Sequence, residues 1–190
     1  MTRVLGISGS LRRDSHNTNL LRAAAEAVGP DVEFELYDGL KEVPPFDEDD
    51  DVHPRPASVA LLNSAIADTD AVLFATPEYN SSIPGQLKNA IDWVSRPVAT
   101  NVLRNKPVAV VGASTGAFGA VWAQAELRKV LASTGARVID LDLAVARAHE
   151  AFDAGGALHS ADHGVRIDEI LEALAGEVER DAQLELARVA

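Results

Sequence analysis

Short apolar runs alternate along the chain with segments whose apolar residues recur at helical spacing. The runs at 4–8, 71–75 and 107–111 are almost continuously apolar, which is typical of strands buried on both faces of a parallel sheet. Residues 32–37 alternate apolar and acidic side chains, which predicts a half-solvated edge strand, and a fifth strand is expected over 137–143. The helical patterns run from Asn19 to a Gly29-Pro30 stop, over 58–67, from Pro84 to Val94, over 123–134 and over 166–179.

Strict alternation of strands and helices predicts right-handed crossovers and a parallel sheet covered on both faces. Five such strands favour an α/β, flavodoxin-like, doubly wound fold with strand order 2-1-3-4-5 and three α/β/α layers. The edge character of 32–37 agrees with that order. The length of 190 residues, without an internal linker or repeat, predicts a single domain over 1–190.

Polar residues concentrate in three loops, 9–18, 76–84 and 112–119, which follow the first, third and fourth predicted strands. In the expected strand order, the carboxyl ends of these strands are neighbours, and ligands of open α/β sheets bind there. The three loops therefore predict one shared site for one large ligand.

The first loop has the composition of a phosphate site. Its hydroxyl, amide and guanidinium groups stand at a predicted helix start, where free N–H groups and the helix dipole attract anions. The candidate ligands are Ser10, Arg12, Ser15, Asn17 and Thr18. Asp14 is discordant in such a site and is expected to point away. The alternative is an ordinary N-cap by Ser15 or Asn17. Neither a Walker loop nor Gly-x-Gly-x-x-Gly is present, which leaves a mononucleotide.

The second loop offers groups suited to a planar ring, namely Pro77, Glu78, Tyr79 and Asn80. Glu78 is alternatively a general acid or base, although this loop holds no partner carboxylate or histidine for it. For Tyr79 the alternative is simple loop packing.

The third loop permits two interpretations. Residues 112–116 match Gly-x-Ser-x-Gly, the nucleophile elbow of α/β hydrolases, with Ser114 as nucleophile. Acids and histidines follow in the chain order that such a triad requires: Asp140 or Asp142, then His149, His159 or His163. In the second interpretation Ser114, Thr115 and Gly116 form a small floor beneath a flat ring. We favour the ring floor, because a hydrolase leaves the first loop unexplained.

Composition excludes several classes of chemistry. Cysteine is absent, which removes disulfides, thiolate nucleophiles and iron–sulfur ligation. The formal net charge of -12, without a visible basic face, argues against nucleic acid and anionic membrane surfaces as partners. The acidic run at 47–51 and the pair His159 and His163 are expected to be solvated, so no metal site is predicted. No apolar run could span a membrane and no signal peptide is evident, so a cytoplasmic location is expected.

Three segments together resemble the NADPH-dependent FMN reductase family, whose members include chromate, quinone and azo reductases. The segments are Gly9-Ser10-Leu11-Arg12-x-x-Ser15-x-Asn17, the stretch from Thr76 to Trp93, and Ser114-Thr115-Gly116. The resemblance covers about residues 3–143 and is most specific in the middle segment. The stretch 144–164 matches nothing in the family pattern, so the far wall of the site is not predicted.

The resemblance implies non-covalent FMN, hydride transfer from NAD(P)H, and reduction of a quinone, azo, chromate or flavin acceptor. It places the FMN phosphate on the first loop and the ring between the second and third loops. No residue is assigned as catalytic, because the flavin carries the chemistry. It also implies a homodimer or homotetramer with the site near a subunit interface. A flavodoxin-like electron carrier is the remaining alternative, but Arg12 argues against it, because the phosphate loops of such carriers typically lack arginine.

Overall fold

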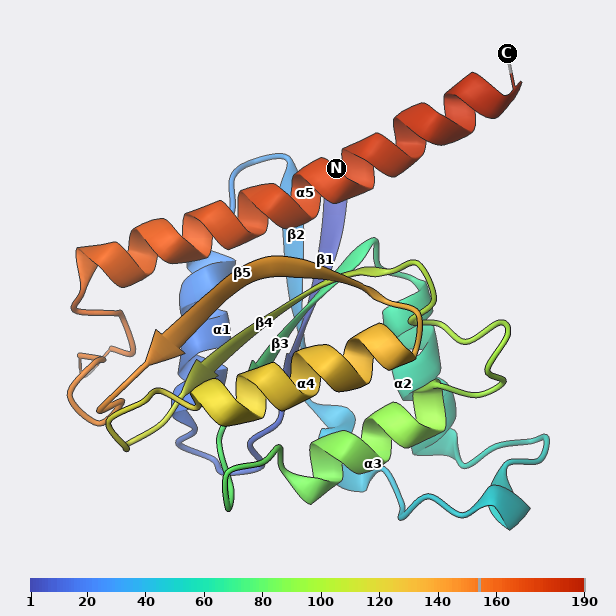
Figure 1. The fold of residues 1–190 in the computed structure, drawn as a ribbon, viewed down its shortest axis with the longest axis horizontal. Helices are drawn as coiled ribbons and strands as arrows, with labels where there is room; N and C mark the ends of the chain where they lie inside the picture. Colours follow the sequence, from blue (N-terminus) through green and yellow to red (C-terminus); the bar gives the residue numbers. More distant parts are fainter. Residues whose placement is uncertain (154, 190) are drawn as a thin grey trace.

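A five-stranded parallel sheet in the order β2-β1-β3-β4-β5 organises the chain in a computed structural model that describes residues 1–153 and 155–189. The predicted flavodoxin-like topology is confirmed (Figure 1). The strands are β1 (Thr2–Ser8), β2 (Val32–Tyr37), β3 (Ala71–Thr76), β4 (Pro107–Ala113) and β5 (Arg137–Val145). The helices are α1 (His16–Ala27), α2 (Ala57–Ala67), α3 (Gly85–Val94), α4 (Val121–Ser133) and α5 (Ala161–Val189), with short 3-10 turns at Gly39–Glu42 and Glu48–Asp50.

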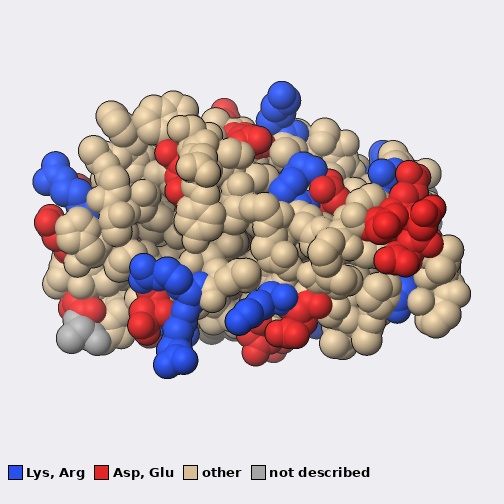
Figure 2. Space-filling view, turned by 90° about the horizontal axis from the view of Figure 1, so that it is seen from below, with Lys and Arg blue, Asp and Glu red and all other residues tan. Residues whose placement is uncertain are grey.

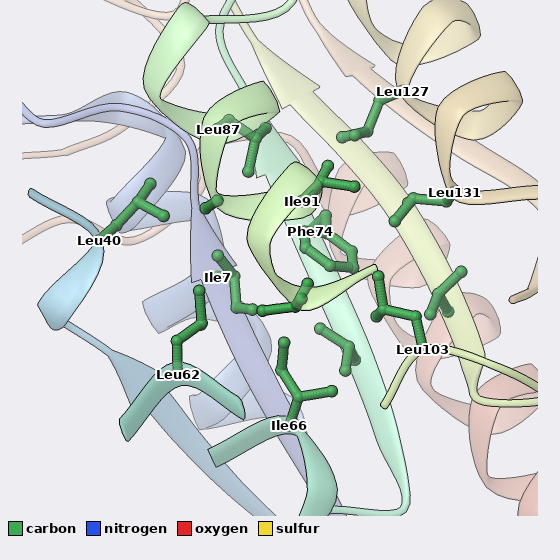
Figure 3. Packing of buried hydrophobic residues seen from close by; sticks show 14 of the residues in the cluster. Ile7, Leu40, Leu62, Ile66, Phe74, Leu87, Ile91, Leu103, Leu127 and Leu131 are labelled. Carbon is green, nitrogen blue, oxygen red and sulfur yellow. The ribbon is translucent and has the colours of Figure 1, made fainter. Parts of the chain in front are cut away.

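Side chains of the central strands alternate between two separate cores, as the twofold repeat of a strand requires. On one face, Phe74 of β3 and its neighbours pack against α2, α3 and α4 (Figure 3). On the other, Leu73 joins a second cluster with α1 and α5. Both faces of β3 and β4 are buried throughout. The sheet is therefore a rigid middle layer from which the loops at its carboxyl edge project.

Gly6 of β1 leaves room for the Phe34 ring of the neighbouring strand β2. A Cβ atom at this position would lie 2.7 Å from that ring, whereas its distance of 3.5 Å from Leu21 of α1 would be an ordinary contact. A larger residue would therefore displace the Phe34 ring.

The edge strand β5 carries an irregularity that its sequence pattern does not reveal. Between Val138 and Asp142 it advances by four residues while β4 advances only from Val108 to Val110. Arginine side chains cover carbonyl groups of the bulged segment. Arg128 donates to the Leu141 carbonyl at 2.8 Å, and Arg166 donates to the Asp142 carbonyl at 2.9 Å. Backbone groups of the strand edge are thus partly satisfied within the chain.

Some element limits differ from those predicted. Helix α1 begins at His16 rather than Asn19, because Ser15 already caps it. Helix α5 extends over Ala161–Val189, beyond the predicted 166–179, and its far end projects past the sheet (Figure 1). His159 precedes that helix, whereas His163 lies in its first turn. The first and last described turns of α5 bury few apolar residues, so the apolar spacing in the sequence did not indicate its full length.

A search of the described helices finds none with the length and apolarity needed to span a membrane.

Candidate functional site

The three polar loops meet in one cavity of about 130 Å³ at the carboxyl ends of β1, β3 and β4. This convergence is what the strand order predicted. Nine of the predicted site residues line the cavity: Ser10, Arg12, Ser15, Asn17, Pro77, Glu78, Tyr79, Ser114 and Thr115. Thr18, Asn80 and Gly116 lie outside its lining, while His16 and Ala113 are added to it.

The first loop ends in a capped helix start. Ser15 has extended backbone, and its Oγ accepts a hydrogen bond from the Thr18 N–H at 3.2 Å. The cap engages the third N–H of α1 and leaves those of His16 and Asn17 without intrahelical partners. Both residues line the cavity. The N-cap alternative for Ser15 is therefore confirmed, and it coexists with two free backbone donors at the positive end of α1.

Arg12 places its guanidinium at the same end of the cavity. One of its nitrogens donates to the Asp14 carbonyl, which holds the loop in a tight turn. Asp14 is exposed and lies outside the cavity lining, as expected of the discordant carboxylate. Ser10 lines the cavity beside Arg12. The hydrogen-bond donors of the first loop that line the cavity thus include a guanidinium, a hydroxyl and two backbone N–H groups.

Asn17 is engaged differently from the sequence expectation. Its side chain is buried, and its amide nitrogen donates to the Ala113 carbonyl at 2.9 Å. Its amide oxygen accepts from the Ala113 N–H, also at 2.9 Å. Both polar ends of the side chain are used in tying the start of α1 to the end of β4. Only the backbone N–H of Asn17 remains for a ligand.

Thr18 faces a second cavity on the β2 side of the loop. Its hydroxyl donates to Ser8 Oγ at 3.0 Å, which draws it away from the first cavity. Ser10 and Arg12 line both cavities and form the partition between them.

Glu78 of the second loop caps a helix across the cavity. Its Oε2 accepts from the Trp122 N–H at 3.1 Å and from the Ala123 N–H at 3.2 Å. Ala120, which precedes α4, offers no side-chain cap and has a left-handed backbone with φ of 64°. The carboxylate therefore compensates free donors and the helix dipole. This contact accounts for Glu78 without an acid–base role.

A tight turn sets the position of Tyr79 at the cavity mouth. Tyr79 and Ser82 exchange backbone hydrogen bonds at 3.0 and 3.1 Å. Asn80 and Ser81 occupy the two central positions with φ of 54° and 60°, a geometry that asparagine tolerates well. Asn80 thus stands at the exposed tip of the turn, whereas the Tyr79 side chain, 49% exposed, is available to a planar ligand.

Ser114 takes part in a local turn within the third loop. Its Oγ accepts from the Gly116 N–H at 3.1 Å, and the Gly116 carbonyl accepts from the Arg147 N–H. Among the described residues, no histidine has a hydrogen bond to Ser114, and His149 is 3.2 Å from the Glu150 carboxylate instead. Asp140 pairs with Arg128. The sequence order of a hydrolase triad is present, but its members are not brought together.

His16 and Ala113 are the lining residues that sequence reasoning missed, and the His16 ring packs against Phe152. The two rings stack with centroids 5.9 Å apart and an interplanar angle of 11°. Burial, the Arg12 guanidinium and His149 together lower the pKa of His16. Phe152 belongs to the stretch 144–164 that no pattern placed. The sequence feature that could have indicated His16 is its position directly after the N-cap Ser15, at the start of α1.

The acidic run of the long 44–54 loop is used locally. Asp47 accepts from the Asp49 N–H at 3.0 Å, and Asp51 pairs with Arg55 at 2.7 Å. Residues 1–153 and 155–189 contain no group of three or more His, Asp or Glu side chains arranged to hold a metal ion.

The fold and cavity define a flavodoxin-like protein in which a cationic, donor-rich loop and an aromatic side chain line one cavity. The sequence pattern of the NADPH-dependent FMN reductase family matches residues 2–150. The chain is 43% identical over 157 residues to an NAD(P)H-dependent FMN reductase from Pseudomonas aeruginosa, covering 82% of this chain and 84% of that one. It is 44% identical over 126 residues to a 2-hydroxy-1,4-benzoquinone reductase from Burkholderia sp, covering 66% and 68%.

Structural similarity extends over nearly the whole chain. The flavoenzyme NAD(P)H:(acceptor) oxidoreductase FerB from Paracoccus denitrificans superposes with a TM-score of 0.82 at 34% identity, covering 95% of this chain and 98% of that one. The chain belongs to the NADPH-dependent FMN reductase family. It is an oxidoreductase, and FMN and NAD(P)H are the cofactor and co-substrate of its family.

Proposed function

We propose that this chain binds FMN in the cavity between its three loops and reduces a small quinone-type acceptor with electrons from NAD(P)H. The observation that carries the proposal is that the donor groups of the first loop and the Tyr79 side chain line one cavity. A quinone is favoured among the expected azo, chromate and flavin alternatives by the names of the similar reductases. We further propose that one domain, residues 1–190, holds the whole site.

The residues present fit the chemistry of FMN. Arg12, the Ser10 hydroxyl and the free N–H groups at the start of α1 would hold the phosphate, whose charge suits the helix dipole. Pro77 and Tyr79 would border the ring on one side, and the Ser114-Thr115 turn on the other. Asn17 would act through Ala113, by fixing the distance between the two loops.

Bound FMN supplies hydride acceptance and electron transfer to a second substrate. The chain's own contribution is binding and orientation. Arg12 neutralises phosphate charge, and Tyr79 offers a ring face. Glu78 is the one carboxylate among the described lining residues, and it is hydrogen-bonded to the start of α4. It is therefore not assigned a role in proton transfer. The proposal therefore keeps the site without an assigned catalytic acid or base.

The first experiment is the colour of the purified protein. A yellow preparation that bleaches when NADPH is added supports the proposal. A colourless preparation that takes up no added FMN, but is labelled at Ser114 by a fluorophosphonate, would overturn it in favour of a hydrolase. Steady NADPH oxidation with a quinone and no partner reductase would exclude an electron carrier.

The phosphate assignment has its own test in Arg12→Ala. This change should weaken FMN binding about tenfold or more, since a charge-assisted hydrogen bond contributes about 1.5–3 kcal/mol. Riboflavin binding should change little, because riboflavin lacks the phosphate. Arg13→Ala is the matched control, since Arg13 is exposed and outside the cavity lining. Equal losses for FMN and riboflavin would remove Arg12 from the phosphate site.

We also propose a homodimer or homotetramer. The support is an aromatic patch beside the site, where Phe118 is 61% and Trp122 50% exposed and their rings meet edge to face at 5.1 Å. Isolated chains rarely leave two neighbouring aromatic rings so exposed without a partner surface. Light scattering should give more than one chain mass, and Trp122→Glu should reduce it. A monomer in the wild type would contradict the proposal.

The remaining proposals concern the class of binding partner and the cellular location. On the face seen from below, acidic and basic side chains are scattered among uncharged atoms, and the largest cluster of acidic atoms lies at the right end (Figure 2). This distribution and the net charge of -12 support small molecules rather than nucleic acid as partners. A cytoplasmic location stays a prediction from the sequence, to be checked by fractionating cells.

A further inference from the structure

A second cavity of about 280 Å³ lies on the β2 side of the first loop. It shares two lining residues, Ser10 and Arg12, with the candidate FMN cavity. A group bound to the phosphate end of the first cavity would therefore be adjacent to the second. The function proposed above leaves this second cavity without a role.

The second cavity is cationic in a strongly acidic chain. Arg12, Arg22 and Lys41 line it, against a single lining carboxylate, that of Asp38. The chain as a whole has a net charge of -12. Cations gathered from a loop, a helix and a 3-10 turn onto one cavity create a local potential opposite to the global one. Such an arrangement favours an anionic ligand.

The uncharged lining suits a nucleoside. Tyr37, the one aromatic residue among the described lining residues, is half-buried, and burial together with Asp38 raises the pKa of its phenol. Its hydroxyl therefore stays protonated and able to donate. Leu36 and Leu40 add apolar surface. Gly39 makes room for this ring, because a Cβ there would lie 2.6 Å from the Tyr37 hydroxyl.

The second cavity has room for a ligand group of its own. It measures about 280 Å³, against about 130 Å³ for the first. Its cations and its one aromatic ring together suit a phosphorylated nucleoside.

We propose that the second cavity binds the phosphorylated adenosine half of a dinucleotide, with Lys41 and Arg22 contacting phosphate and Tyr37 bordering the base. This inference rests on the proposed function, since it uses the FMN phosphate site as its neighbour. Two dinucleotides carry the required chemistry: FAD bound in place of FMN, and NAD(P)H bound beside FMN.

The test is calorimetric titration of the FMN-loaded protein with ADP and with 2′,5′-ADP, and of the apoprotein with FAD and FMN. Binding of either adenosine phosphate to the loaded protein, tighter for 2′,5′-ADP, identifies NADPH as the source. FAD binding the apoprotein at least as tightly as FMN, with ADP competing, identifies FAD. Either result supports the proposal.

Variants locate the binding. Lys41→Gln and Arg22→Gln should each weaken the adenosine phosphate about tenfold, the equivalent of one charge-assisted contact. Lys41→Gln should leave FMN affinity within about twofold, because Lys41 lines only the second cavity. Lys129→Gln, an exposed change on α4, is the control and should alter neither affinity.

Failure has a clear form. The proposal is overturned if neither ADP nor 2′,5′-ADP binds and FAD binds more weakly than FMN. It is also overturned if Lys41→Gln leaves the affinity for these ligands unchanged. In both cases FMN binding would still support the proposed function. Absence of FMN binding would instead overturn the proposed function. In that case, titration of ADP and 2′,5′-ADP into the apoprotein still shows whether the second cavity binds an adenosine phosphate.

Discussion

Asn17 and Ala113 hold each other through two hydrogen bonds of 2.9 Å, one in each direction. The side-chain amide of Asn17 bonds both the N–H and the carbonyl of the Ala113 backbone, 96 positions further along the chain. This pair joins the start of α1 to the end of β4, and both residues line the cavity. A residue that sequence reasoning assigned to the ligand is thus engaged by the protein itself.

Removing that pair should destabilise the fold. Asn17→Ala leaves the buried N–H and carbonyl of Ala113 without partners, and we expect a loss of about 2–4 kcal/mol in the free energy of unfolding. Urea denaturation of the apoprotein measures it. Asn63→Ala is the control, because the Asn63 amide bonds only the Val59 carbonyl within its own helix. A loss no larger than that of the control would show that Ala113 is satisfied in another way.

Glu78→Ala should weaken α4 rather than abolish chemistry. Loss of a cap costs about 0.5–2 kcal/mol, and loss of the charge at the helix start adds about 0.3–1 kcal/mol. Glu78→Gln keeps an acceptor oxygen and should recover part of the stability. Chemical denaturation ranks the three proteins, with the exposed Glu126→Ala as the control. If the Gln variant keeps full stability but loses quinone reduction, Glu78 has a chemical role that its contacts do not show.

His16 should make stability depend on pH. Burial first, then Arg12 and His149, lower its pKa in the folded protein below the ordinary histidine value of 6.5. The unfolded chain therefore binds the proton more readily, so stability is complete above about pH 6.5 and decreases as the pH falls below it. His16→Phe should flatten this part of the profile in apoprotein melts at several pH values. His53→Asn, on the exposed 44–54 loop, should not. An unchanged slope in His16→Phe would locate the dependence elsewhere.

Arg128 should protect the edge of the sheet. Its guanidinium bonds the Leu141 carbonyl and the Asp140 carboxylate, so Arg128→Ala exposes strand-edge backbone. We expect a loss of about 0.5–1.5 kcal/mol in unfolding free energy and association that increases with protein concentration. Dynamic light scattering follows the second effect. Lys129→Ala, one residue further on α4 and exposed, controls for the loss of positive charge.

The sequence by itself determined the strand–helix alternation, the strand order and the meeting of three loops, because twofold and helical periodicities are local and parallel crossovers have one hand. It also marked Ser10, Arg12 and Tyr79 as residues of the shared site, since their residue types suit the ligand and their loops follow adjacent strands. Family membership followed from motifs of the same loops.

Only the tertiary structure decided what each polar group contacts. Asn17 and Glu78 carry the residue types of ligand-binding groups, yet partners distant in sequence, Ala113 and Ala123, occupy their side chains. His16 lines the cavity, and its ring stacks on Phe152, which belongs to a stretch without a readable pattern. A polar side chain forms its hydrogen bond with the unsatisfied group that lies within about 3 Å of it. That distance is set by packing across the sheet, which no local pattern encodes.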